Sequence, residues 1–329
     1  MRKIGPFETS SVGLGCMNLS HAYGLPPSKK QGEAVLQQAL DLGITHFDSA
    51  ALYGFGRNEE LVGSFLKPHR NKIVLASKCG MRGENGVRTI DGRPEKLRED
   101  IENSLRRLQT DVIDIYYLHR YDKGTPVPIE ESVGAIGRFI EEGKVRAMGL
   151  SEVSASTIAK AHAVHPIAAV QSEYSLWSRN VEIEVLDICK ELDIAFVAFS
   201  PLARGFLTSI DLDPENFAEK DIRRGHPRFK EPHFSENLQW LSKYRAIAHD
   251  AGCTPAQLAL AWVLKQADNL HIIPGTTSID HLVENWGAKD IELSNEICQQ
   301  VEALVNQETV SGPRYPAAAQ AEIDTEEFV

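Results

Sequence analysis

The sequence predicts an α/β fold, a (β/α)8 TIM barrel, formed as a single domain by residues 1–329. Two features of the chain support this prediction. Continuous apolar runs, typical of strands covered on both faces, occur eight times, at 12–15, 45–48, 73–77, 113–118, 147–150, 168–171, 195–199 and 272–274. Helical segments separate most of these runs, and eight parallel strands joined by right-handed helical crossovers favour a closed barrel.

The helical segments are amphipathic, and several have recognisable ends. Ser28 is expected to cap a helix that Gly43 terminates, because a serine oxygen accepts a bond from the first turn and glycine adopts the left-handed conformation. Asp91 precedes a second helix, and a third ends at Gly143. Further helices are predicted at 180–192, 236–250, 255–267 and 279–288.

A doubly wound open sheet is the alternative fold. In its dinucleotide-binding form it carries a Gly-x-Gly-x-x-Gly motif after the first strand, and the segment 13–18 (GLGCMN) does not complete that motif. Two irregular segments remain, a long polar loop at 204–235 after the seventh strand and the tail 312–329. Long loops are often lids or mobile segments. We also expect the tail to cover one mouth of the barrel.

Composition disfavours several classes of partner. The chain carries 35 basic and 46 acidic residues, and this net charge of −11 disfavours the phosphate backbone of nucleic acids. Its five cysteines are odd in number and form no Cys-x-x-Cys pair, which argues against disulfides and a metal site and fits a reducing cytoplasm. With no membrane-spanning run and no signal peptide, a cytoplasmic location is expected. The oligomeric state is not indicated.

Four ionisable residues follow the second, third and fourth predicted strands. Asp48 ends the run at 45–48 and Tyr53 follows it, Lys78 follows the run at 73–77, and His119 follows the run at 113–118. The carboxyl ends of parallel strands meet at one rim of a barrel, where active sites lie. These four side chains are therefore expected to converge in a site that delivers protons.

The chemistry expected of this set is proton donation to a carbonyl oxygen. A lysine ammonium beside Tyr53 is expected to lower the phenol pKa by about two units from its usual value near 10. Asp48 would hold Lys78 in place, and His119 would hydrogen-bond the substrate oxygen. Because no activated serine or cysteine nucleophile accompanies the set, a hydride cofactor is the natural reductant.

The later strand ends resemble a cofactor groove. Ser151 and Gln171 are suited to a carboxamide, and Phe199 to stacking on a planar ring. Ser200 and Arg204 follow the seventh strand and are suited to a pyrophosphate. The Gly-Thr-Thr-Ser segment at 275–278 opens a helix, whose N-terminus attracts anions.

Taken together, these motifs resemble the aldo-keto reductase superfamily nearly end to end, through GLGCM at 13–17, FDSAALYG at 47–54, SK at 77–78, YLH at 117–119, GLS at 149–151, QSEY at 171–174, FSPLARG at 199–205 and IPGTTS at 273–278. The resemblance implies NADPH-dependent reduction of small aldehydes or ketones, with Tyr53 as proton donor, Lys78 and Asp48 tuning it, and His119 orienting the carbonyl. It also implies cofactor contacts at Gly15, Cys16, Met17, Asp48, Ser151, Gln171, Phe199, Ser200, Pro201, Leu202, Arg204, Gly205, Gly275, Thr276, Thr277, Ser278, His281, Glu284 and Asn285.

Three positions depart from the family pattern. Glu152 stands where many members carry asparagine, and Gly275 and His281 stand where many carry the lysine and arginine that grip the 2′-phosphate of NADP. NADPH is the expected cofactor, with NADH as an alternative. Among subfamilies, the bacterial general aldehyde and pyridoxal reductases are the most similar.

Two other functions are considered. One is a cofactor-binding regulatory or redox-sensing protein resembling the β-subunits of potassium channels, and the other is an aldolase that forms a Schiff base on Lys78. The substrate itself is not identified, because barrel specificity depends on loops. Here these are 18–25, 82–88, 120–126, the polar loop and the tail, with Tyr23 and Trp177 as candidate pocket residues.

Overall fold

The computed structural model describes residues 1–84, 87–124 and 127–328. Residues 85, 86, 125, 126 and 329, which belong to the predicted specificity loops 82–88 and 120–126 and to the tail, lie outside the described residues.

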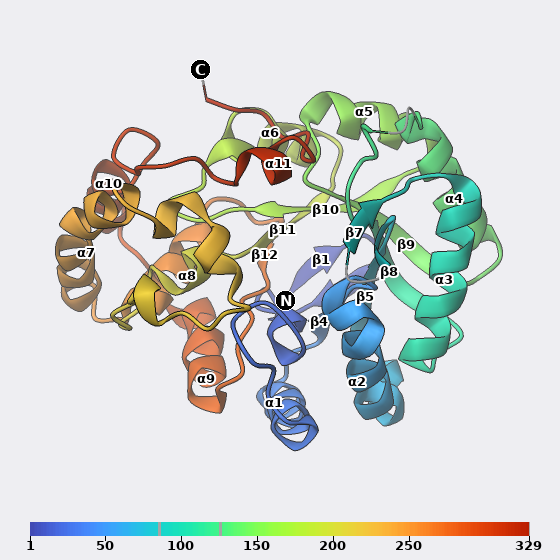
Figure 1. Ribbon diagram of the computed structural model, residues 1–329, viewed down its shortest axis with the longest axis horizontal. Helices are drawn as coiled ribbons and strands as arrows, with labels where there is room; N and C mark the ends of the chain where they lie inside the picture. The colour runs from blue at the N-terminus through green and yellow to red at the C-terminus, as the bar shows by residue number, and fades with distance from the viewer. Residues whose placement is uncertain (85–86, 125–126, 329) are drawn as a thin grey trace.

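Eight parallel strands form the central sheet, in the spatial order β12-β11-β10-β9-β8-β5-β4-β3. Each of the eight apolar runs contributes one strand: β3 (Leu14–Gly15), β4 (His46–Asp48), β5 (Val74–Cys79), β8 (Ile113–Leu118), β9 (Val145–Ser151), β10 (Ile167–Glu173), β11 (Ala195–Phe199) and β12 (Leu270–Ile272). A parallel bridge between Val12 and Ile272 joins the first strand region to the last, with Gly13 N donating to Ile272 O at 2.8 Å. The sheet therefore closes into the predicted barrel, seen in Figure 1.

An N-terminal hairpin, β1 (Arg2–Ile4) and β2 (Phe7–Thr9), was not predicted from the sequence. Ile4 is fully buried and packs in one apolar cluster with the barrel-interior residues Val74, Ile115 and Val197. The hairpin thus closes the end of the barrel opposite the strand carboxyl ends, and leaves the other end for the site.

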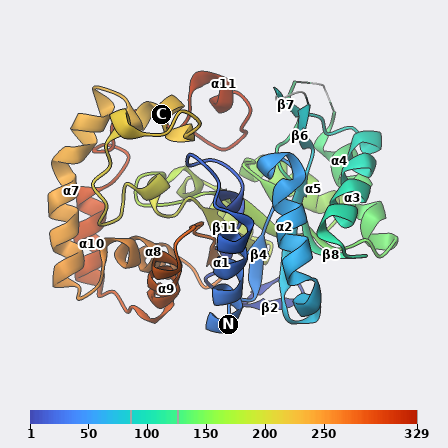
Figure 2. The same cartoon turned by 60° about the horizontal axis from the view of Figure 1, so that its bottom comes forward.

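Helices cover the outside of the barrel (Figure 2). Helix α1 begins after Ser28, whose oxygen accepts from Gln31 N in a capping box, and ends at Gly43 in the left-handed conformation. These are the predicted ends. The helices are α1 (Lys29–Leu42), α2 (Arg57–Leu66), α3 (Pro94–Leu108), α4 (Ile129–Glu141), α5 (Ala155–Val164), α6 (Val185–Glu191), α7 (His233–Asp250), α8 (Pro255–Lys265), α9 (Ile279–Gly287), α10 (Asn295–Leu304) and α11 (Ala317–Gln320).

Three segments border the open mouth of the barrel. A second hairpin, β6 (Met81–Glu84) and β7 (Val87–Ile90), follows β5. The predicted polar loop at 204–235 is more ordered than expected: it contains 3-10 turns and buries His226, Arg228 and Phe229 before α7 begins at His233. The tail runs from α10 across the molecule through α11, as the red segment in Figure 1 shows.

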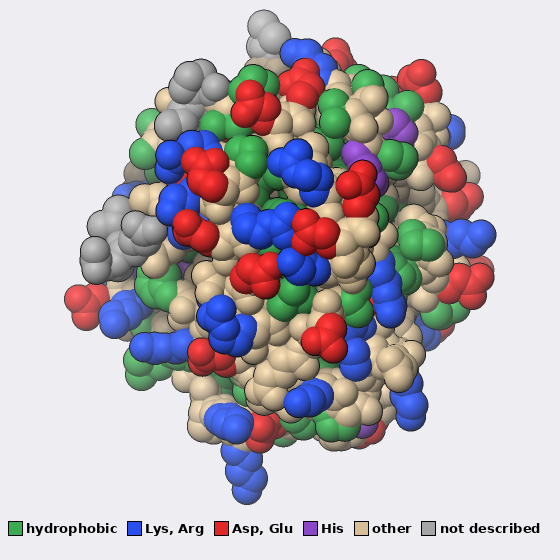
Figure 3. Space-filling model, turned by 90° about the vertical axis from the view of Figure 1, so that its right-hand side faces the viewer, with side chains coloured by type: hydrophobic (Ala, Val, Ile, Leu, Met, Phe, Trp, Pro, Cys, Tyr) green, Lys and Arg blue, Asp and Glu red, His purple; other side chains and the backbone are tan. Residues whose placement is uncertain are grey.

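The surface carries both signs of charge. On the face formed by α3 and α4, basic and acidic side chains are interspersed (Figure 3), and Arg98 pairs there with Glu142. Among the described residues, no helix has the length and apolarity needed to cross a membrane.

Candidate active site

The four predicted proton-delivery residues lie together at the carboxyl ends of neighbouring strands. Asp48 ends β4, Lys78 lies near the end of β5, and His119 directly follows β8. Tyr53 begins the short 3-10 helix η2 (Tyr53–Gly56). Asp48 and Lys78 are each 1% exposed, so water is largely excluded from the charged pair.

Lys78 is the centre of the hydrogen-bond geometry. Its ammonium forms an ion pair with Asp48 and donates to Ser49 O at 2.9 Å and to the Tyr53 hydroxyl at 3.3 Å. The second carboxylate oxygen of Asp48 accepts from Gln171 Nε2 at 2.8 Å. Lys78 is therefore fixed from three sides, with the Tyr53 oxygen as its outward-facing partner.

The pKa of Tyr53 differs from the prediction. Burial raises the phenol pKa and, together with the negative Asp48, outweighs the lowering by Lys78, so the net shift is upward. For Lys78, burial lowers the pKa, but the adjacent Asp48 and Tyr53 reverse this and the net pKa is raised. The expected fall of about two units is therefore wrong for the structure as it stands, because the desolvation of the phenolate was left out.

His119 is held as a neutral imidazole. Burial, followed by the positive charges of Arg120, Lys78 and Arg88, lowers its pKa well below the usual value. Its ring lies 5.9 Å from the Tyr53 ring, centroid to centroid, and nearly perpendicular to it. Its Nδ1 has no hydrogen-bond partner among the described residues. Two polar groups, the Tyr53 hydroxyl and this imidazole, are thus available to one carbonyl oxygen.

A cavity of about 580 Å³ opens above these residues. It is lined by most of the predicted contacts, namely Gly15, Met17, Asp48, Tyr53, His119, Ser151, Gln171, Phe199, Ser200, Pro201, Leu202, Arg204, Gly205, Gly275, Thr276, Thr277, His281, Glu284 and Asn285. Lys78 lies beneath, against Asp48 and Tyr53. Two predicted contacts do not line it: Cys16 is fully buried, and Ser278 caps α9 by accepting from His281 N.

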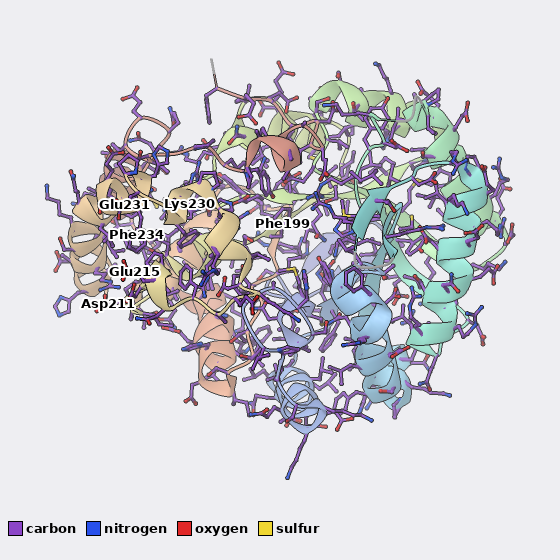
Figure 4. The ribbon with its side chains drawn as sticks, in the orientation of Figure 1. Phe199, Asp211, Glu215, Lys230, Glu231 and Phe234 are labelled. Atoms are coloured by element: carbon purple, nitrogen blue, oxygen red, sulfur yellow. The ribbon has the colours of Figure 1, made fainter. Side chains whose placement is uncertain are left out.

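Two features of the cavity fit a nicotinamide dinucleotide. Asn285 Oδ1 is buried at the cavity wall without a hydrogen-bond partner in the described structure, so it is available to a ligand donor. Phe199 ends β11 half-buried near the centre of the molecule, as Figure 4 shows, and its side chain lines the cavity. In the same view Asp211 and Glu215 of the polar loop lie to one side.

Gly275 is required by its surroundings. A Cβ at this position would lie 2.7 Å from Asn18 Oδ1 and 2.9 Å from Gly15 O, closer than van der Waals contact permits. The lysine that the family resemblance led us to expect at this position therefore does not fit this backbone. His281, in contrast, is exposed in the first turn of α9 and lines the cavity, so a longer cation can be accommodated there.

Arg204 is paired with a protein carboxylate, which was not expected of a pyrophosphate ligand. It lines the cavity, but its guanidinium donates to both carboxylate oxygens of Glu173, at 2.6 and 3.0 Å. Its charge is therefore already balanced by a buried carboxylate.

The C-terminal tail contributes residues that sequence reasoning missed. Arg314 donates to Glu152 and, at 3.2 Å, to Glu173 Oε2. Both carboxylates are fully buried. Glu152 also accepts from Glu173 N at 2.7 Å, so it anchors the tail instead of facing a carboxamide. Because Arg314 is 162 positions from Glu152, no local pattern signals this pairing.

Further cavity residues were not named individually as cofactor contacts, although most of them lie in the loops that the sequence predicted to set specificity. They are Asn18, His21, Leu52, Met81, Arg88, Arg120, Thr208, Ser209, Ile210, Ile222, Arg223, Gly225, His226, Ala256, Ile273, Pro274, Tyr315, Pro316 and Ala319. Tyr23 lines the cavity as predicted, but Trp177 does not: it is 2% exposed and stacks on Phe206 at 4.8 Å. The loops were predicted, but which of their residues face the cavity was not, because the path of a loop over the barrel is not encoded by periodicity.

The sequence profile of the Aldo/keto reductase family matches residues 11–306. The aldo-keto reductase yakc of Schizosaccharomyces pombe, whose name specifies NADP(+), is 42% identical over 98% of this chain and 96% of its own length. The chain belongs to the aldo/keto reductase family, and it is an oxidoreductase by that membership.

Solved structures agree with this assignment. The glycerol dehydrogenase AKR11B4 of Gluconobacter oxydans superimposes with a TM-score of 0.84 at 27% identity, over 96% of this chain and 97% of that one. An aldo/keto reductase from Klebsiella pneumoniae, solved with NADP and acetate, superimposes with a TM-score of 0.71 at 28% identity, over 99% and 100% of the two chains.

Proposed function

We propose that this protein is an NADP(H)-dependent reductase of small aldehydes or ketones, with Asp48, Tyr53, Lys78 and His119 as its catalytic residues. The observation that carries the proposal is the hydrogen bond from Lys78 Nζ to the Tyr53 hydroxyl at 3.3 Å, at the floor of the cavity and backed by the buried Asp48. A phenol coupled in this way is suited to give a proton to an alkoxide as it forms.

Each of these residues has one task. Tyr53 hydrogen-bonds the carbonyl oxygen and transfers its proton to it, while the Lys78 ammonium stabilises the phenolate left behind. The neutral His119 ring orients the carbonyl from the other side. Asp48 neutralises Lys78 and fixes its position. The nicotinamide, when bound, supplies the hydride to the carbonyl carbon.

The same cavity holds the residues that would bind the cofactor. Ser151 and Gln171 would bind the carboxamide, Phe199 would stack on the ring, and Thr276 and Asn285 would contact the other end of the dinucleotide. The printed names of the relatives support NADP: the yeast relative is named for NADP(+), and the Klebsiella structure was solved with NADP.

Exchange of Tyr53 for phenylalanine tests the proposal. Loss of the proton donor should lower the turnover number for aldehydes by about 10²- to 10⁴-fold, with NADPH binding, measured by fluorescence titration, retained. Tyr121→Phe removes a hydroxyl from a half-buried tyrosine that does not line the cavity, and serves as the matched control.

Two results would contradict the proposal. Undiminished turnover in Tyr53→Phe would remove Tyr53 from the chemistry. Tight NADPH binding by the unaltered protein without turnover of any aldehyde or ketone in a broad panel would favour the regulatory, redox-sensing alternative.

A further inference from the structure

Four arginines line the cavity, and three of them are already paired with carboxylates. Arg204 is held by Glu173, and Arg223 by Asp221 at 2.7 Å. Arg88 forms an ion pair with Glu322 of the tail. The fourth is Arg120, the residue directly after His119.

Arg120 has no carboxylate within ion-pair distance in the part of the chain that the structure describes. Its Nη1 donates to the carbonyl oxygen of His119 at 2.7 Å and to Ser151 Oγ at 3.2 Å. Both acceptors are neutral, so the guanidinium keeps its full positive charge in a half-buried position. A partly desolvated cation of this kind favours an anionic partner.

The charge of Arg120 acts at the reacting end of the cavity. After burial, Arg120 is the strongest influence lowering the pKa of His119, and it also lowers that of Tyr53. The predicted phosphate contacts, in contrast, follow β11 and β12, on the other side of the barrel. An anion bound by Arg120 therefore belongs to the substrate and not to the cofactor phosphates.

We propose that Arg120 binds the carboxylate of the substrate, so that the preferred substrates are aldehydes or ketones carrying a carboxylate a short carbon chain from the carbonyl. This inference rests on the proposed reductase function and deepens it. The Nη2 and Nε groups of Arg120 have no hydrogen-bond partner among the described residues, and a planar guanidinium with two such free donors matches a carboxylate. A phosphate dianion would need a second cation, and Arg88, which also lines the cavity, is paired with Glu322.

The test compares 4-oxobutanoate with its methyl ester, which has the same carbon skeleton and no charge. The unaltered protein should show a higher kcat/KM for the acid. In Arg120→Met this preference should fall by about 10- to 100-fold, the range for losing a hydrogen bond to a charged group. Arg120→Lys, which keeps the charge, should restore part of it. Arg138→Met removes an exposed charge from α4, outside the cavity, and controls for net charge.

A binding measurement separates this proposal from the reductase function. Succinate should bind the unaltered protein in calorimetry with NADP(+) present, and binding should be lost in Arg120→Met. Equal losses for acid and ester, together with weaker cofactor binding, would overturn the proposal and make Arg120 a positioning residue for Ser151. A preference for glyceraldehyde 3-phosphate over 4-oxobutanoate would overturn the carboxylate assignment. Failure to reduce any carbonyl, with succinate still bound at Arg120, would contradict the reductase function alone.

Discussion

Removal of the Arg314 guanidinium should be among the most damaging single changes to the tail. Arg314 is 3% exposed and is the cation that pairs with the fully buried Glu152, while Glu173 retains Arg204 in its absence. Arg314 also donates to Thr325 Oγ1 at 3.0 Å, which fastens the end of the tail. Breaking a buried pair by removing one partner costs about 3–5 kcal/mol. We expect Arg314→Met to lose stability in that range.

Urea unfolding, followed by tryptophan fluorescence, measures this loss. Arg93→Met is the matched control, because Arg93 pairs with Asp91 at the surface with its side chain 47% exposed, and such pairs contribute about 0–1 kcal/mol. Arg314→Met combined with Glu152→Gln should recover part of the loss, since the second change removes the unpaired charge. A loss below about 1 kcal/mol in Arg314→Met, or no recovery in the double variant, would refute the assigned role.

The same network predicts the direction of a pH effect. Burial alone would raise the pKa of Glu173, but Arg204 and Arg314 outweigh it and the folded-state pKa lies well below its usual 4.5. A carboxyl with a depressed folded pKa stabilises the fold above its unfolded pKa, and this contribution is lost as pH falls through the folded pKa. Arg314→Met should therefore lose less stability on acidification below pH 4.5 than the unaltered protein.

Three further predictions concern the site and the barrel. The turnover number for carbonyl reduction should show no inflection near pH 6.5, because His119 is already neutral. It should not fall as pH rises towards 10, because the pKa of Tyr53 is raised. A steep loss of turnover between pH 7 and 8 would contradict these expectations. His281→Arg should strengthen NADPH binding relative to NADH by about 3- to 10-fold in fluorescence titration, whereas Gly275→Lys should weaken both, because its Cβ collides with Asn18 and Gly15. Burial lowers the pKa of His271 to about 3, so the free energy of unfolding should decrease as pH falls from 6.5 towards 3. His271→Leu should make this decrease shallower by up to about 1.4 kcal/mol per pH unit. An unchanged dependence on pH would show that His271 does not take up a proton on unfolding.

Local patterns were sufficient to predict the barrel. Apolar runs predicted all eight strands, and the ends of α1 at Ser28 and Gly43 follow from the chemistry of those two residues. The hairpin β1–β2 was missed because three-residue strands show no usable alternation. Helices α2, α5, α10 and the short α11 were also missed, although Ser154 and Ser294 do cap α5 and α10 and offered a signal for them.

The site was predicted where strand order alone fixes position. Asp48, Lys78 and His119 meet because their strands are neighbours, and this needs no knowledge of side-chain packing. Arg204 shows the limit of that reasoning. Its place after β11 predicted a phosphate contact, but its guanidinium is bound to Glu173, a carboxylate 31 positions earlier in the sequence. Charge pairing across the barrel mouth depends on loop paths that a linear pattern does not contain.

Glu152 connects the C-terminal tail with the end of strand β9. Its position, directly after Ser151, places it at the strand end expected to bind the carboxamide. In this protein its carboxylate turns to Arg314, while Asp324 N donates to its backbone oxygen at 3.0 Å. The tail is therefore tied to the same strand end that carries Ser151, and Ser151 in turn contacts Arg120. A change that loosens the tail should for this reason alter cofactor and substrate binding together.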